Sequence, residues 1–258
     1  KTKYGFKPMP SAQSVGEKDN DEYTHQVAKT IANTLMLCGI NLNYAPTVDV
    51  YNALCPVLGK VGRCYSNDVK KIAHFAEIII NEHKNVGVKT CLKHFPGHGD
   101  VSVDSHLDLP LITKSREQMD SLELYPFRKM IDAGVDAVMV AHLSIPAIDN
   151  TANKPSSLSY PTITKLLKEE LSFKGIIFTD ALEMKGVTKY FPGGEISSEA
   201  LVAGNDMLCL PQDINGTIEK TKRAIRKKRL RWYDINQRVK KVLEAKYKFG
   251  VANWQPID

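Results

Sequence analysis

Five short apolar segments recur along the chain, and stretches with helical periodicity separate them. The segments are residues 41–50, 88–94, 137–142, 175–180 and 206–210. Their apolar residues form continuous runs instead of alternating with polar residues, as in parallel strands that are covered on both faces. We therefore interpret these segments as five buried strands of a parallel sheet.

The stretches between the strands carry recognisable helix starts. Side chains that cap helix N-termini stand at Asn20 or Asp21, Asn67 or Asp68, Ser115, Ser159 and Asp234. The last of these helices has its apolar face at Ile235, Val239, Val242 and Leu243. This alternation of strands and helices predicts a parallel α/β fold, either a barrel or an open doubly wound sheet.

Polar residues end several of the predicted strands. They are Asp49, Lys93, His94, His142 and Asp180. In a (β/α)8 barrel, residues at the carboxyl ends of the strands meet on one face and carry the chemistry. No strand is followed by GxGxxG or GxxxxGK[ST], so a nucleotide site is not indicated. A closed barrel needs eight strands and the sequence shows five, so we expect an incomplete barrel.

The positive charge of the chain is concentrated in one stretch. The 258 residues carry a formal net charge of +6, yet residues 220–231 hold eight cationic residues and no acid, and the remainder would carry −2. Such a run is typical of a nucleic-acid patch or of a solvated helix end. Because no aromatic platform accompanies it, we favour the solvated helix and expect no nucleic-acid partner.

Composition narrows the class of protein further. Apolar residues make up 43% and charged residues 25%, which are ordinary values for a globular domain and exclude a disordered or fibrous chain. No apolar run approaches the roughly 18 residues of a membrane span, so we expect no membrane-spanning helix. The five cysteines lack CxxC spacing and their number is odd, which argues against a disulfide framework or a zinc knuckle.

The densest polar cluster follows the second predicted strand. It includes His94, His98, Asp104 and His106 around the glycines of KHFPGHGD (93–100). Two chemistries fit this cluster. The three histidines and an aspartate are suitable ligands for zinc or iron. Alternatively, Asp104 orients His106, raises its pKa and makes it a proton donor near neutral pH.

A second cluster, Phe178-Thr179-Asp180, ends a very apolar strand. Asp180 either caps the following helix or serves as a fixed carboxylate at the mouth of a site. A carboxylate opposite a proton donor points to glycosidic bond cleavage through a covalent intermediate. Arg63, Lys93 and His142 are candidate contacts to sugar hydroxyls or charges, although each alone is more typical of a structural or surface residue. Asp49 is equally typical of a turn or a cap.

These motifs occur together in one known family. KHFPGHGD (93–100) with DSH (104–106), and also FKPMP (6–10), YAPTVDV (44–50), GR (62–63), MVAH (139–142), FTDAL (178–182) and AGND (203–206), fall in the same order. The chain thus resembles the β-N-acetylglucosaminidase branch of family-three glycoside hydrolases along nearly its whole length. The resemblance implies a TIM-type (β/α)8 barrel and a retaining mechanism.

The resemblance also implies roles for individual residues. Asp180 corresponds to the nucleophile, His106 to the general acid/base and Asp104 to its partner, while Lys93, His94 and Arg63 correspond to residues that hold the sugar. The implied substrate is terminal β-linked N-acetylglucosamine from peptidoglycan fragments or chitin oligomers, and no metal or cofactor is used. A phosphorylase with the same dyad and a carbohydrate-binding fragment without activity remain alternatives.

One departure concerns the extent of the barrel. The family barrel begins earlier and includes a strand that ends in Asp-Gln-Glu-Gly-Gly, which this sequence lacks. We therefore expect residues 1–258 to form one catalytic barrel domain without its N-terminal strands, that is, a fragment that is truncated, cleaved, or completed by another chain such as the missing segment. Residues 121–127 and 188–192 resemble exported relatives with a β-lactamase-like domain after the barrel. That likeness favours an extracytoplasmic location, whereas the cysteines are more typical of a reducing compartment.

Overall fold

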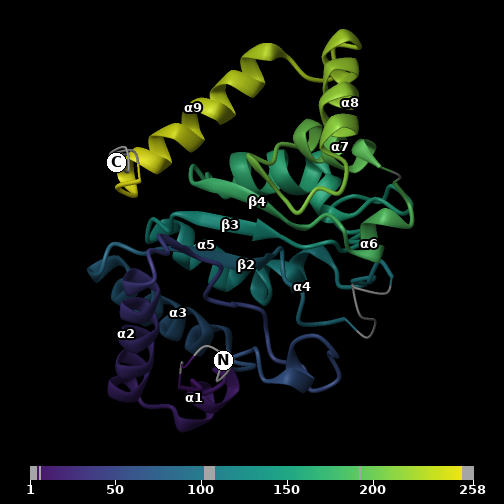
Figure 1. The fold of residues 1–258 in the computed structure, drawn as a ribbon. Helices are drawn as coiled ribbons and strands as arrows, with labels where there is room; N and C mark the ends of the chain where they lie inside the picture. Colours follow the sequence, from purple (N-terminus) through teal and green to yellow (C-terminus); the bar gives the residue numbers. More distant parts are fainter. Residues whose placement is uncertain (1–4, 6, 102–107, 192, 252–258) are drawn as a thin grey trace, which may run out of the picture.

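A parallel five-stranded sheet forms the centre of the computed structural model, which describes residues 5, 7–101, 108–191 and 193–251. The strands follow the order of the sequence across the sheet (Figure 1). They are β1 (Leu42–Asn43), β2 (Lys89–Phe95), β3 (Ala137–Val140), β4 (Ile176–Ala181) and β5 (Met207–Cys209). The curled sheet and its alternating helices form an incomplete (β/α) barrel, which confirms the predicted fold class and all five strand positions.

The first strand is shorter than residues 41–50, although this segment follows β2 over most of its length. Backbone hydrogen bonds join Cys91 N–H to the Ala45 carbonyl at 2.9 Å and Val48 N–H to the Lys93 carbonyl at 2.8 Å. Between these bonds stands Pro46, which has no N–H to donate and interrupts the regular ladder. The segment therefore reaches Asp49 as an extended chain beside β2.

Helices cover the sheet in the order that the sequence predicts. The long ones are α2 (Asp21–Leu37), α3 (Val69–Asn85), η4 (Pro161–Glu170), α7 (Gly194–Ala203), α8 (Ile214–Arg226) and α9 (Trp232–Lys248). The shorter ones are α1 (Ala12–Lys18), η2 (Gly59–Val61), α4 (Arg116–Ser121), α5 (Leu124–Asp132), η3 (Ser156–Leu158) and α6 (Lys185–Thr188). Asn20, Asp68 and Ser115 are N-caps as predicted, and η4 after Ser159 is wound as a π-helix.

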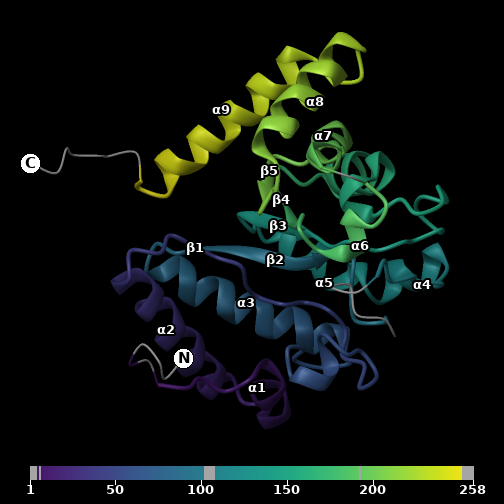
Figure 2. The ribbon, with the colours of Figure 1, turned by 45° about the vertical axis from the view of Figure 1, so that its right-hand side comes forward.

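The outer face of the sheet holds the main core. Leu92, Val138 and Ile177 point to this face and lie in one buried cluster with Ile72 of α3 and Phe127 of α5. Figures 1 and 2 show α2 and α3 beside the β1–β2 end of the sheet and α7 and α8 beside β4. Burial of these apolar side chains fixes the sheet against its helices and so holds the strand ends in place.

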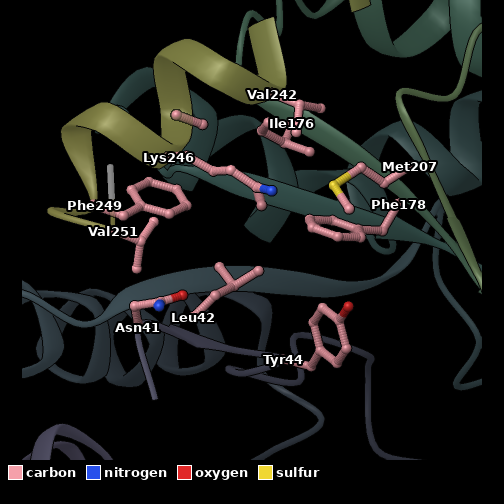
Figure 3. Close-up of a pocket in the computed structure, with 12 residues that line it drawn as sticks. Asn41, Leu42, Tyr44, Ile176, Phe178, Met207, Val242, Lys246, Phe249 and Val251 are labelled. Atoms are coloured by element: carbon pink, nitrogen blue, oxygen red, sulfur yellow. The ribbon is translucent and has the colours of Figure 1, made fainter. Parts of the chain in front are cut away.

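The inner face of the sheet is also apolar but more open. Cys91, Met139 and Phe178 point to this face, and the Tyr44 ring packs edge-on against Phe178 with 5.3 Å between ring centroids. A cavity of about 370 Å³ lies between this face and α9. Figure 3 shows Lys246 reaching toward Phe178 across it, while Phe249 lies beside Val251 at the other end of the cavity.

The last helix differs from its prediction. It begins at Trp232, and Asp234 is its third residue, where it accepts hydrogen bonds from the backbone and side chain of Arg231. Val239 and Leu243 are about half exposed, whereas Ile235 and Val242 are partly buried and Val242 packs against the inner face of the sheet, so the predicted apolar face is only partly covered. The cavity between the helix and the inner face of the sheet leaves the rest of this apolar face uncovered.

Part of the basic stretch is neutralised within the fold. Arg229 pairs with Glu199 at 2.6 Å, Arg231 pairs with Asp234 at 2.7 Å, and Lys222 pairs with Glu219 at 3.0 Å. The stretch forms the end of α8 and the turn into α9, as the solvated-helix interpretation predicts. Within the described ranges, no helix has both the length and the hydropathy to cross a bilayer.

Candidate active site

Polar side chains gather at the carboxyl edge of the sheet. Lys93 and His94 lie in β2, His142 follows β3, and Asp180 lies near the end of β4. Because the strands are parallel, their carboxyl ends meet at one edge, and the structure thereby brings these predicted residues together. Asp104 and His106, the predicted dyad, lie outside the described residues.

Asp49 is the most heavily bonded group at this edge. Its carboxylate is 1% exposed and accepts hydrogen bonds from His94 Nδ1 at 2.7 Å, from the His94 backbone N–H at 3.1 Å and from the His98 backbone N–H at 2.7 Å. Burial alone would raise the pKa of this carboxyl, but the neighbouring His94 ring and the hydrogen bonds from His94 and His98 outweigh burial and lower it. Asp49 is therefore an anion that ties two neighbouring segments together.

Arg63 reaches the same cluster from the turn after η2. Its Nη1 donates to the Val57 carbonyl at 2.9 Å, and its Nη2 lies 3.3 Å from His94 Nε2. Burial first and the charge of Arg63 second lower the pKa of the Lys93 ammonium group at the same edge of the sheet, while Asp180 acts in the opposite direction. The Lys93 ammonium group thus interacts with both the Arg63 guanidinium and the Asp180 carboxylate.

Asp180 is partly buried at the end of β4, and its Oδ1 accepts the Ala181 N–H at 2.8 Å. Burial raises the pKa of its carboxyl, but the nearby His94 and His142 rings and the Ala181 N–H together outweigh burial and lower the pKa. The helix-cap interpretation is wrong, because the next helix, α6, begins at Lys185 after Met184. Asp180 is held as a carboxylate at neutral pH.

His142 is 1% exposed and uses both ring nitrogens within the protein. Its Nδ1 lies 2.6 Å from Ser157 Oγ and its Nε2 lies 3.0 Å from the Ala181 carbonyl oxygen. Since a carbonyl only accepts, Nε2 carries the proton and Nδ1 accepts from the Ser157 hydroxyl. His142 therefore braces the peptide that follows Asp180.

The loop after β2 depends on two glycines. A Cβ on Gly99 would lie 1.9 Å from the Val50 carbonyl oxygen, and Gly97 has a φ of +127° with Glu123 directly beside it. Only glycine allows these close approaches. Lys114 pairs with Glu123, whose side chain is fully buried, and with Asp100 at 3.3 Å. The start of this loop is thereby fixed to the turn before α5.

The metal-site interpretation meets a local obstacle at His94. Its Nδ1 faces Asp49 and its Nε2 faces Arg63, so neither nitrogen is available to a cation without rearrangement. Among the residues that the structure describes, no three His, Cys, Asp or Glu side chains are arranged to hold a metal ion.

A parallel barrel-type sheet with an ionised aspartate and cationic side chains at its carboxyl edge is an arrangement typical of glycoside hydrolases. The chain belongs to glycosyl hydrolase family 3, because residues 3–245 match the family's N-terminal domain. This match confirms the family resemblance that the motifs indicate.

Curated relatives support the same family. The chain is 36% identical over 205 residues to β-hexosaminidase A of Pseudoalteromonas piscicida, covering 75% of this chain and 34% of the relative. It is also 36% identical over 189 residues to a β-hexosaminidase of Neisseria meningitidis, covering 70% of this chain and 51% of the relative. The chain thus spans about a third to a half of the length of these relatives.

Solved structures agree with the fold. A family 3 β-N-acetylglucosaminidase from Paenibacillus superposes with a TM-score of 0.91 at 32% identity, covering 98% of this chain and 48% of that chain. NagZ from Neisseria gonorrhoeae, solved in complex with N-trifluoroacetyl-D-glucosamine, superposes with a TM-score of 0.75 at 29% identity, covering 92% of this chain and 68% of that chain. The described core therefore has the architecture of family 3 enzymes.

Proposed function

We propose that this chain carries the catalytic centre of a retaining glycoside hydrolase that removes terminal β-linked N-acetylglucosamine. The observation that carries the proposal is the Asp180 carboxylate, kept ionised at the end of β4 beside His94, His142 and Lys93. A carboxylate in such a position stabilises an oxocarbenium-like transition state and forms a covalent bond to the anomeric carbon. The names of the relatives support the choice of sugar.

The reaction proceeds in two steps. Asp180 Oδ1 is occupied by the Ala181 N–H, so we assign Oδ2 as the oxygen that attacks the anomeric carbon. As this bond forms, the glycosidic bond breaks and the leaving oxygen takes a proton from His106, which Asp104 orients. In the second step His106 removes a proton from water, the hydroxide oxygen bonds to the anomeric carbon, and Asp180 is released.

Arg63, Lys93 and His94 supply the sugar contacts in this proposal. Guanidinium and ammonium groups donate hydrogen bonds to hydroxyl and carbonyl oxygens, which both sugar rings and N-acetyl groups offer. The positive charge of Lys93 also interacts favourably with the Asp180 carboxylate. The natural substrates that we propose are peptidoglycan fragments or chitin oligomers with a terminal N-acetylglucosamine.

The test is hydrolysis of a chromogenic aryl β-N-acetylglucosaminide by matched variants. Asp180→Asn removes the nucleophile and is expected to lower kcat/KM by about 10³-fold or more. The control is Glu183→Gln, which changes an exposed carboxylate three residues later and is expected to leave turnover near the wild-type rate. Near-wild-type turnover by Asp180→Asn would remove Asp180 from its role.

A further inference from the structure

Asp49 is a buried charge that the proposed reaction does not use. Its Oδ2 lies 2.7 Å from His94 Nδ1, and its Oδ1 lies 2.7 Å from the His98 backbone N–H. A deprotonated carboxylate only accepts hydrogen bonds. His94 Nδ1 must therefore carry a proton in this arrangement.

The other nitrogen of His94 meets the opposite requirement. Arg63 Nη2 lies 3.3 Å from His94 Nε2, and a guanidinium group only donates. His94 Nε2 must therefore hold a lone pair. The two contacts together are compatible with one form of the ring, which is neutral and protonated at Nδ1.

We propose that Asp49 is a positioning residue that sets the tautomer of His94 and, through His94 Nε2, the direction of the Arg63 guanidinium. The three side chains form a relay in which Asp49 accepts from His94 and His94 accepts from Arg63. The importance of this relay for sugar binding rests on the proposed function, because Arg63 and His94 are the proposed sugar contacts.

The reverse tautomer would disrupt the relay. A proton on His94 Nε2 would face the N–H groups of Arg63, so donor would meet donor and the guanidinium would lose its support at that end. The remaining support of Arg63 is the bond from Nη1 to the Val57 carbonyl at 2.9 Å. Asp49 therefore acts on the sugar pocket without facing the sugar itself.

Two other histidines provide internal references for the tautomer. His83 Nδ1 donates to the Ile79 carbonyl at 2.8 Å and its Nε2 lies 3.0 Å from Asn43 Nδ2, so this ring is also protonated at Nδ1. His142 has the opposite form, with its proton on Nε2 toward the Ala181 carbonyl. One protein thus contains a reference ring for each neutral form.

Two-bond ¹H–¹⁵N correlation spectra of the ¹⁵N-histidine-labelled chain at neutral pH test the proposal. The wild-type His94 ring, identified by its loss in His94→Gln, is expected in the Nδ1–H form that His83 shows. In Asp49→Asn an amide N–H₂ faces Nδ1, so we expect His94 to move to the Nε2–H form while His83 and His142 stay unchanged. An unchanged His94 ring in Asp49→Asn, or an Nε2–H ring in the wild type, overturns the proposal.

A second variant keeps the test decisive if Asp49→Asn does not fold. Arg63→Met removes the donor to Nε2 but leaves Asp49, so His94 is expected to keep its Nδ1–H form. A change of tautomer in Arg63→Met would assign the control of His94 to Arg63 and overturn the proposal. These readouts need no turnover, so they separate this inference from the proposed reaction. If the reaction is also as proposed, Asp49→Asn raises KM about tenfold with a smaller change in kcat.

Discussion

His142 donates its Nε2 proton to the backbone carbonyl of Ala181 across 3.0 Å, and Ala181 in turn donates its N–H to Asp180 at 2.8 Å. The backbone carbonyl and the backbone N–H of Ala181 are therefore both hydrogen-bonded beside Asp180, the proposed nucleophile. Ser157 closes the arrangement by holding the other nitrogen of the His142 ring at 2.6 Å. The position of Asp180 thus depends on η3 as well as on its own strand.

Ser157→Ala tests this dependence. It removes the donor to His142 Nδ1 and leaves a buried acceptor without its partner, which is expected to destabilise the fold by about 1–3 kcal/mol. Urea unfolding followed by circular dichroism measures the change. Ser121→Ala is the control, because its hydroxyl bonds the Gln118 carbonyl at an exposed site and should shift stability by less than about 0.5 kcal/mol. Equal effects of the two substitutions would contradict the prediction.

His98 makes stability depend on pH. Burial, with a smaller effect from the neighbouring His94 ring, lowers the pKa of His98 from 6.5 to about 4. Between these two values the unfolded chain binds a proton that the folded chain does not, so stability is full above pH 6.5 and falls as the pH drops toward 4. Lowering the pH from 7.5 to 5 should cost about 2 kcal/mol through this group.

Urea unfolding of His98→Gln at the same two pH values measures that contribution. The variant is expected to lose less stability on acidification than the wild type, by about 2 kcal/mol. His74→Gln is the comparison, because this ring is half exposed and pairs with Asp21 at the surface. An acid sensitivity in His98→Gln that matches the wild type would show that other groups carry the effect.

The pair of Lys114 and Glu123 supports the loop after β2. The Glu123 side chain is fully buried and Lys114 is 21% exposed, so Lys114→Met strands a buried carboxylate and is expected to destabilise the fold by about 2–4 kcal/mol. Adding Glu123→Gln to that variant removes the stranded charge. The double variant should therefore be more stable than the sum of the single effects predicts, as a double-mutant cycle in urea would measure.

Lys165→Met is the matched control for this cycle. Its partner Glu169 and Lys165 itself are both more than half exposed, so water compensates the lost charge and stability should change little. Strict additivity of Lys114→Met and Glu123→Gln would indicate that the two groups do not stabilise each other.

Local patterns predicted the fold well because each strand and each cap is encoded by neighbouring residues. The apolar runs at 88–94 and 175–180 became β2 and β4, and Asp68 and Ser115 became caps. The start of α9 was missed because Arg231, not Asp234, stands at the N-cap, a position that cap preferences do not favour.

The buried relay of the site was not predictable in the same way. Asp49 accepts hydrogen bonds from His94 and His98, which lie 45 and 49 positions further along the chain. The pairing of β1 with β2 brings these residues together. In the sequence, the position of Asp49 at a strand end was as typical of a turn or cap residue as of a functional one. No sequence pattern marked Glu123 either, because its role in holding the loop depends on the close approach of Gly97 in the folded chain. Asp180 could be singled out as a candidate because a carboxylate in an apolar strand is costly wherever it occurs.

The cavity beneath α9 has a practical consequence for measuring these variants. Leu42, Phe178 and Met207 form an apolar wall there, and α9 covers it without a single fully buried side chain. Environment-sensitive dyes of the kind used in thermal-shift screens bind such walls in the native state. Their fluorescence would then report release of the dye from this cavity as well as unfolding of the sheet. Calorimetry or circular dichroism is therefore the sounder way to rank the stabilities of the variants.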